Sequence, residues 1–425
     1  MFARLAGIVT CAAVLSGCAL IPPESPARPA VRTSVSQIAY IGSDDHVYVA
    51  EADGSGARQI SQHVSGLSSS EGWTFRWPTY SPDGRRLAFA GYRSRSGALL
   101  SAAVLSGDAD QTSSSTLLES SDLAPIYLYW SPDNRHVAAL LQHGRTLELH
   151  LLDSGGAEPP RLVASGQPLY WSWARDGKTL AVHIGGDGQS GDAWVGLLHL
   201  EQGTASQERF ADPPGGFRAP AWSPSGDKLA YVALGGGSSL LSVRDAAGQI
   251  VRVASSQTDV AFNWSPAGDW LAFAFASDDS PSIYDGVEIA RADGSERHRL
   301  TQEPQVGFFW APDGKRLALL GLDTSARALA WSTIQVDGKG RRTLASFAPS
   351  SDFAFQLPFF DQYAQSISIW SPDSRRLVYG SDGGAERRNG ESSGERVMVL
   401  DVDGPSPPAT AAAGGVAVWA PPRSR

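Results

Sequence analysis

The chain has 425 residues and a formal net charge of −9, with 44 acidic residues against 35 Lys and Arg. An acidic chain lacks the positive surface with which nucleic-acid-binding proteins neutralise phosphates, so no nucleic-acid partner is expected. Gly contributes 45 residues and Pro 27, and no long segment has the 3.6-residue apolar period of a helix. These features indicate a turn-rich, all-β protein.

The first 17 residues are typical of a signal peptide. Arg4 supplies one positive charge, and the apolar run from Leu5 to Leu15 is too short to span a bilayer. The run ends in Leu-Ser-Gly-Cys, which resembles the lipobox of bacterial lipoproteins. That resemblance implies cleavage before Cys18 and attachment of acyl chains, palmitate among them, at Cys18. A plain secretory signal cut nearby and a retained anchor are the alternatives.

Lipidation at Cys18 would place the protein outside the cytoplasm, anchored to the cell membrane or the outer membrane. Ala19 follows the cysteine, which favours the outer membrane if the host has one. The only other cysteine, Cys11, would leave with the signal peptide, so we expect no thiol catalysis and no cysteine-based metal site. No cofactor is expected either. Residues 18–35 are rich in proline and predict a semi-extended tether.

Residues 36–425 repeat one eleven-residue pattern, of which WAPDGKRLALL is an example. Successive copies are 42 to 60 residues apart, a spacing typical of propeller blades with about four strands each. The aromatic residues that begin the copies are Tyr80, Trp130, Trp173, Trp222, Trp264, Trp310 and Trp370, and Trp419 begins a truncated copy. We expect these aromatic side chains to pack between neighbouring blades.

Each copy predicts a strand, a tight turn and a second strand. Ser-Pro-Asp-Gly suits a type I turn, because Pro presets φ at the second corner and Gly suits the fourth. The apolar triplet that follows, such as Leu-Ala-Phe at 87–89, is typical of a short buried strand. A further β run and an Asp-Gly-type turn complete a four-stranded antiparallel meander.

The two ends of residues 36–425 complement each other. Ile38-Ala39-Tyr40 occupies the place of the apolar triplet without a preceding aromatic half, and residues 415–422 supply that half around Trp419. The last strand is therefore predicted to pair into the first blade and close the ring, which removes exposed sheet edges. The count of repeats predicts eight blades, with seven as the fallback if one unit is degenerate.

The aromatic-Ser-Pro-Asp-Gly pattern, followed by segments such as ADGSERHRLT, resembles the WD40-like (PD40) repeats of TolB-type β-propellers, over about residues 36 to 422. The resemblance implies a propeller fold. Propellers of this type occur as periplasmic scaffolds, as gating domains of prolyl-oligopeptidase-like enzymes and in some lyases, so the fold does not determine the function.

A catalytic serine is not expected. Gly390-Glu391-Ser392-Ser393-Gly394 matches the G-x-S-x-G pattern, but it lies in a polar insert and no histidine follows Ser392 in the chain. A metal is also not expected at His136, His143 and His150. A two-residue turn at His143-Gly144 would set His136 opposite Leu151 and point His136 and His150 to opposite faces, whereas a three-residue loop would bring them together.

Aromatic residues outside the repeat predict a contact surface. Trp73 and Trp77 precede the first complete copy, and the longest interval contains Phe353, Phe355, Phe359, Phe360 and Tyr363 together with Asp361. An insertion of this kind lies on one rim, often on the binding face. Two interpretations stay open: an exposed aromatic patch that binds a partner, or a segment that folds back and plugs the ring.

The resulting functional hypothesis is a monomeric, envelope-anchored lipoprotein whose propeller is a non-catalytic scaffold for an envelope protein or a ligand. The alternative is a glycan- or peptide-binding module, or a hydrolase or lyase, that uses the central funnel. Arg76 and Arg218 lie just ahead of inner strands and are the predicted funnel residues. Convergent polar side chains at one mouth of the channel would favour the alternative.

Overall fold

Residues 35–425 form one compact unit, which we call the second unit because residues 1–34 precede it. The computed structural model describes residues 37–68, 72–186, 193–200, 205–216, 218–383 and 394–423. The predictions for residues 1–36, including Cys18, and for Ser392 lie outside the described residues. No helix in the described part is both long enough and apolar enough to cross a bilayer.

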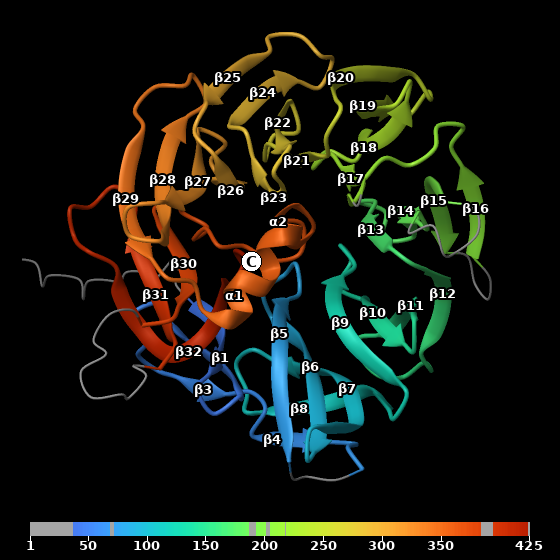
Figure 1. The fold of residues 1–425 in the computed structure, drawn as a ribbon. Helices are drawn as coiled ribbons and strands as arrows, with labels where there is room; N and C mark the ends of the chain where they lie inside the picture. The colour runs from blue at the N-terminus through green and yellow to red at the C-terminus, as the bar shows by residue number, and fades with distance from the viewer. Residues whose placement is uncertain are drawn as a thin grey trace, which may run out of the picture. The chain divides into compact units, whose positions relative to one another are not determined.

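The second unit is a β-propeller, as the repeats predict. Short antiparallel strand sets are arranged around a common axis, and in most of them the first strand is innermost (Figure 1). The first four sets are β5 (Trp73–Tyr80), β6 (Arg86–Arg95), β7 (Ala98–Asp108), β8 (Ser113–Ser120); β9 (Leu123–Trp130), β10 (His136–His143), β11 (Thr146–Asp153), β12 (Arg161–Gly166); β13 (Leu169–Trp173), β14 (Thr179–Ile184), β15 (Trp194–Leu200), β16 (Ala205–Arg209); and β17 (Ala221–Trp222), β18 (Lys228–Gly235), β19 (Ser238–Asp245), β20 (Ile250–Ser256).

The later sets follow the same order, and two further strands are added to the ring. They are β21 (Val260–Trp264), β22 (Trp270–Ser277), β24 (Val287–Arg291), β25 (His298–Thr301); and β26 (Gln305–Trp310), β27 (Arg316–Asp323), β28 (Ala328–Gln335), β29 (Arg342–Phe347). The additions are β4 (His63–Ser65), parallel to β8, and β23 (Ser280–Tyr284), which touches β26. The remaining strands are β30 (Arg376–Ser381), β31 (Arg396–Asp401), β32 (Ala409–Trp419), β1 (Gln37–Gly42), β2 (Val47–Glu51) and β3 (Arg58–Gln59).

The last strand pairs with the first strand. The initial half of β32 pairs with β31, and its final half pairs with β1, so that Ile38 lies opposite Trp419. The strand order of this sheet is β3-β2-β1-β32-β31-β30. Because β32 belongs to two strand sets and β23 joins two others, the hydrogen-bonded sheets do not correspond one-to-one to blades. The blade number, eight or seven, therefore stays a prediction.

The repeated turns have the backbone hydrogen bond of a tight turn, together with a side-chain bond that was not predicted. Gly84 N–H donates to the Ser81 carbonyl at 2.8 Å, and Ser81 Oγ donates to Asp83 Oδ1 at 2.6 Å. Gly84 has a φ of 70°, a conformation that favours glycine. Asn134 and Ser374 occupy the same place in other copies at φ values of 63° and 61°.

The repeated tryptophans join successive strand sets, as predicted. Trp310 Nε1–H donates at 3.2 Å to the carbonyl of Asn263, the residue just before the preceding repeat tryptophan. The same bond recurs in four other copies, Trp130 to Thr79, Trp173 to Tyr129, Trp264 to Ala221 and Trp370 to Phe309. Arg86, two residues beyond Gly84, places its guanidinium over Trp130 of the next copy. One buried unit therefore both fills and cross-links the ring.

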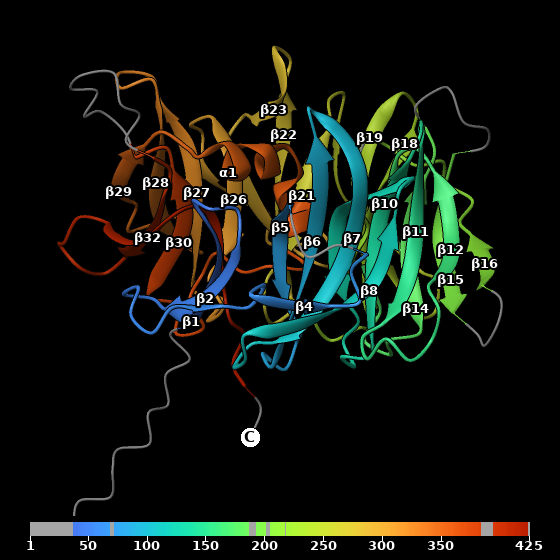
Figure 2. The same ribbon diagram turned by 90° about the horizontal axis from the view of Figure 1, so that it is seen from below.

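The propeller has two unlike faces. We call the end with the Ser-Pro-Asp-Gly turns the turn face, and the end with the hairpins between second and third strands the helix face, because the helical segment lies there (Figure 2). Arg423 Nε donates to the Gly84 carbonyl at 3.2 Å, and Ala420 N–H donates to the Gln37 carbonyl at 2.9 Å. Both described ends of the chain therefore lie at the turn face.

Candidate functional site

Residues 348–369, which we call the insert, connect β29 to Trp370 and cross the centre of the ring (Figure 1). They contain α1 (Ser351–Gln356), the 3-10 helix η1 (Leu357–Phe359) and α2 (Phe360–Tyr363). Ser350 caps α1 by accepting from Phe353 N–H, which satisfies one of the free donors of the first turn. Pro358 lies at the start of η1, where its fixed φ and missing N–H are tolerated.

Hydrogen bonds hold the insert to strand sets on different sides of the ring. Ser351 N–H donates to Glu395 Oε1 at 2.7 Å, next to β31. Gln362 Nε2 donates to the Trp171 carbonyl at 3.0 Å, and Tyr127 Oη donates to the Gln362 carbonyl at 3.1 Å. The insert is thus bound into the molecule at both of its helices.

Most aromatic residues of the insert follow the second interpretation, in which the segment folds back and plugs the ring. Phe360 is only 1% exposed and packs against Phe308, with ring centroids 4.8 Å apart. Phe353 and Tyr363 are also buried. The expected exposed patch is therefore reduced to Phe355 and Phe359, which are 54% and 38% exposed.

The two tryptophans predicted for the same patch separate. Trp73 is buried in β5, and the Arg93 guanidinium lies 5.9 Å from its ring. Trp77 lies at a break in the pairing of β5 with β6 and has a φ of 58°. Its ring centroid is 5.2 Å from that of Phe355, so Trp77 joins the exposed part of the insert and Trp73 belongs to the core.

Both predicted funnel arginines contact the insert. Arg76 Nη2 lies 2.8 Å from Asp45 Oδ1, and its Nε lies 3.7 Å from Asp352 Oδ2 in α1. Arg218 Nη1 lies 3.7 Å from Asp361 Oδ2 in α2, and both side chains are buried. Each arginine therefore pairs with a carboxylate of a different helix of the insert.

Arg218 stays protonated in this setting. Burial alone would lower its pKa, but the negative charge of Asp361, with contributions from Tyr284 and Asp259, raises that pKa overall. Arg218 Nη2 also donates to Tyr284 Oη at 2.9 Å. A buried cation is tolerated here because the neighbouring oxygens compensate its charge.

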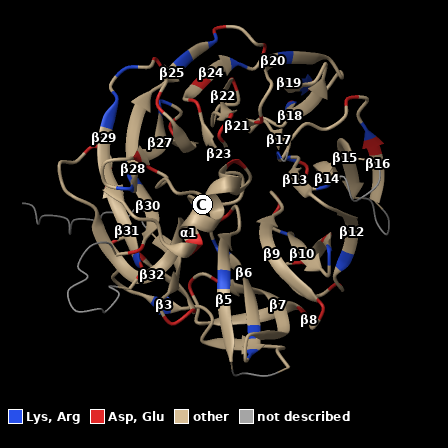
Figure 3. Ribbon diagram, in the orientation of Figure 1, with Lys and Arg blue, Asp and Glu red and all other residues tan. Residues whose placement is uncertain are grey.

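A cavity of about 520 Å³ opens on the helix face beside the insert. Its walls are mostly apolar. Aromatic residues from β9, β13 and the insert contribute to them, among them Tyr127, Tyr170, Phe355 and Phe359. The charged residues at its lining are Arg218 and Asp259. Figure 3 shows most charged segments on outer strands and loops, with the inner strands mostly uncharged. Polar groups within an apolar hollow are typical of a ligand site.

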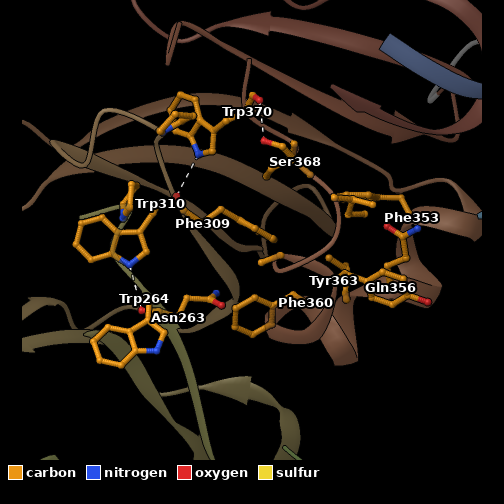
Figure 4. A pocket seen from close by; sticks show the side chains of 16 residues that line it. Asn263, Trp264, Phe309, Trp310, Phe353, Gln356, Phe360, Tyr363, Ser368 and Trp370 are labelled. Carbon is orange, nitrogen blue, oxygen red and sulfur yellow. Dashed lines mark hydrogen bonds between the residues drawn. The ribbon is translucent and has the colours of Figure 1, made fainter. Parts of the chain in front are cut away.

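A second cavity of about 250 Å³ lies on the other side of the insert (Figure 4). Trp264, Trp310 and Trp370 of the repeats line it on one side, and Phe360 and Tyr363 line it on the other. Tyr363 also lines the helix-face cavity, so the insert separates the two hollows. The lining of the second cavity has no charged residue among the described residues.

His136 and His150 lie on opposite faces of their sheet, although the turn between their strands is displaced from its predicted position. His143 pairs with Thr146, so the turn is at Gly144-Arg145, and His136 lies opposite Asp153 rather than Leu151. His150 is an odd number of residues from Asp153 and points the other way. His150 Nε2 instead lies 2.8 Å from Glu148 Oε2. No group of three or more potential metal ligands occurs in the described part of the chain.

Asp259 is a site residue that the sequence reasoning missed. It directly precedes β21, an inner strand, and lies five residues before Trp264. Arg76, which lies within β5, and Arg218 have a similar place, four residues before the aromatic residue of their repeat. The same rule applied to acidic residues would have found it. Tyr170 was missed because it lies in β13, whose other residues are buried as in a core strand.

No family model matches the chain. A eukaryotic initiation factor structure superposes with a TM-score of 0.52 at 14% identity, covering 91% of this chain and 99% of that one. An oligogalacturonate lyase in complex with manganese gives 0.52 at 14% identity, covering 85% and 95%. TolB from Acinetobacter baumannii gives 0.41 at 17% identity, covering 85% and 88%. At such identities, the likeness concerns the fold alone.

Proposed function

We propose that this protein is an envelope-anchored lipoprotein whose propeller binds another protein through its helix face, without catalysis. The observation that carries the proposal is the distribution of exposed apolar side chains. Of the eight large hydrophobic residues that are exposed among the described residues, six lie on the helix face: Leu99, Leu100, Leu234, Leu322, Phe355 and Phe359. Concentration of apolar side chains on one face is typical of an interaction surface.

The anchor supports the choice of face. The predicted tether joins the propeller at Gln37, and Gln37 lies at the turn face. In a chain lipidated at Cys18, the tether would therefore leave the propeller at the turn face and keep the helix face clear of the attachment point. All four lysines of the chain, Lys178, Lys228, Lys315 and Lys339, also lie at the turn face.

Site-specific photo-crosslinking in the native cells tests this function. A benzophenone side chain at position 355 probes the helix face, and the same group at position 339, where Lys339 is exposed, is the matched control. We expect one envelope protein to crosslink from position 355 only, and the yield to fall when Phe359→Ser is added. Equal crosslinking from position 339, or none from position 355, would contradict the proposal.

A catalytic role is the second candidate function. The observation that favours it is the helix-face cavity, in which Arg218 and Asp259 provide charge beside apolar walls. A similar fold serves an oligogalacturonate lyase. Turnover of an envelope glycan or peptide by the purified chain, lost in the Asp259→Asn variant, would favour this candidate over the scaffold.

A further inference from the structure

The helix-face cavity has the size and walls of a site for a side chain of a partner. About 520 Å³ is within the range of ligand sites, roughly 300–1,000 Å³. Tyr170 contributes from the ring, and Phe355 and Phe359 contribute from the insert. Aromatic rings presented from separate elements offer both apolar contact and π faces to an occupant.

The charge of the cavity is set by Asp259. Arg218 is already compensated by Asp361 at 3.7 Å and bonded to Tyr284. The Asp259 carboxylate lines the cavity and makes no side-chain hydrogen bond or ion pair with any described residue. It lies close to Gly216, because a Cβ atom added to that glycine would be only 2.4 Å from Asp259 Oδ1. The charged residues of the lining are Arg218 and Asp259. Asp361, which is not part of the lining, pairs with Arg218, so Asp259 leaves the cavity with a net negative charge.

We propose that this cavity binds a basic side chain, Arg or Lys, carried on an extended segment of the partner protein. The positive group lies at Asp259, and the hydrocarbon stem and cation contact the rings of Tyr170 and Phe359, which attract cations through their π faces. An acidic segment is disfavoured, because it meets Asp259 while Arg218 is occupied by Asp361. The proposal rests on the proposed function only in taking the occupant to be part of a protein.

Matched peptides test the charge preference on the full-length protein in detergent. The probes are Ac-Phe-Arg-NH2, Ac-Phe-Gln-NH2 and Ac-Phe-Glu-NH2, and their affinities are measured by isothermal titration calorimetry. We expect the arginine peptide to bind about tenfold more tightly than the glutamine peptide, and the glutamate peptide to bind most weakly. The Asp259→Asn variant abolishes the difference between the arginine and glutamine peptides.

A control variant separates this site from general surface charge. Asp337→Asn removes a carboxylate at the turn face and leaves the preference unchanged. The proposal is overturned if no peptide binds at millimolar concentration, if the glutamate peptide binds best, or if Asp259→Asn leaves the preference intact. If the peptide preference holds while crosslinking from position 355 finds no protein, the pocket stands and the helix-face partner does not.

Discussion

Arg218 of the ring and Asp361 of the insert form a buried ion pair, with Nη1 and Oδ2 3.7 Å apart. The pair joins the segment before β17 to α2, and thus ties the plug to one side of the funnel. Buried charges of this kind are costly when one partner is removed, because the other stays in a poorly solvated position.

We predict that Asp361→Asn lowers the free energy of unfolding by about 3 kcal/mol, since it leaves Arg218 without its nearest carboxylate. Arg218→Met has a comparable cost for the converse reason. The double variant loses less than the sum of the two, as urea denaturation of all four proteins would measure. Additive losses would show that the two side chains do not depend on each other.

The aromatic residues of the insert differ in their expected contributions to stability. Phe360→Ala removes a ring that is 1% exposed and contacts Phe308, so we expect a cost of about 3–5 kcal/mol. Phe359→Ala changes a ring that is 38% exposed and costs less than about 1 kcal/mol. Urea midpoints of the two variants give the comparison, and similar midpoints would contradict the plugged arrangement.

The indole hydrogen bonds between repeats are testable with a matched pair of substitutions. Trp310 Nε1 donates to Asn263, whereas Trp222 Nε1 is buried without a partner among the described residues. Phenylalanine keeps most of the ring contact and removes only the donor. We expect Trp310→Phe to lower the free energy of unfolding by about 1 kcal/mol more than Trp222→Phe. Equal losses would mean that the indole bond adds nothing to the ring packing.

Two histidines are predicted to titrate on opposite sides of the ordinary pKa of 6.5. Burial lowers the pKa of His183, although a bond to the Arg218 carbonyl at 3.0 Å acts against that shift. A hydrogen bond to Glu148 raises the pKa of His143. Proton NMR titration of the ring signals measures both midpoints in one sample.

The contribution of His183 to stability decreases as the pH falls. Its folded pKa is lower than its unfolded pKa, so the unfolded chain binds more protons. The stability from the neutral imidazole is complete above pH 6.5 and is lost as the pH falls toward the folded pKa. A His183 midpoint above 6.5 would reverse this dependence and contradict the burial argument.

Repetition made most of the fold predictable. The residues of each Ser-Pro-Asp-Gly turn favour the turn by themselves, so seven copies predicted the positions of the strands and the tryptophans without information on distant contacts. The turn after His143 was displaced by one residue, because Gly144 adopts a φ of 56° in the turn. The displacement preserved the face on which each histidine lies, since it changed the pairing partner of His136 by two residues.

The position of the insert in the ring could not be predicted from its amino-acid sequence. Phe353, Phe355, Phe359 and Phe360 are the same residue type, and only two are exposed. Their burial depends on the width of the ring and on rings such as Phe308, which lie far away in sequence. The Arg218–Asp361 pair depends on the same geometry, so each residue was noticed separately and their contact was not.

The shared strand β32 has a consequence for how the chain reaches its folded state. Ile38 is among the first residues of the propeller to be synthesised, and its partner Trp419 is among the last. Until those final residues are available, β1 lacks its inner neighbour and its edge can pair with the wrong strand. Such a distant pairing is slow to form because a very long loop must close first. A ribosome stalled shortly before Trp419 would therefore hold a nearly complete propeller with its first sheet still open.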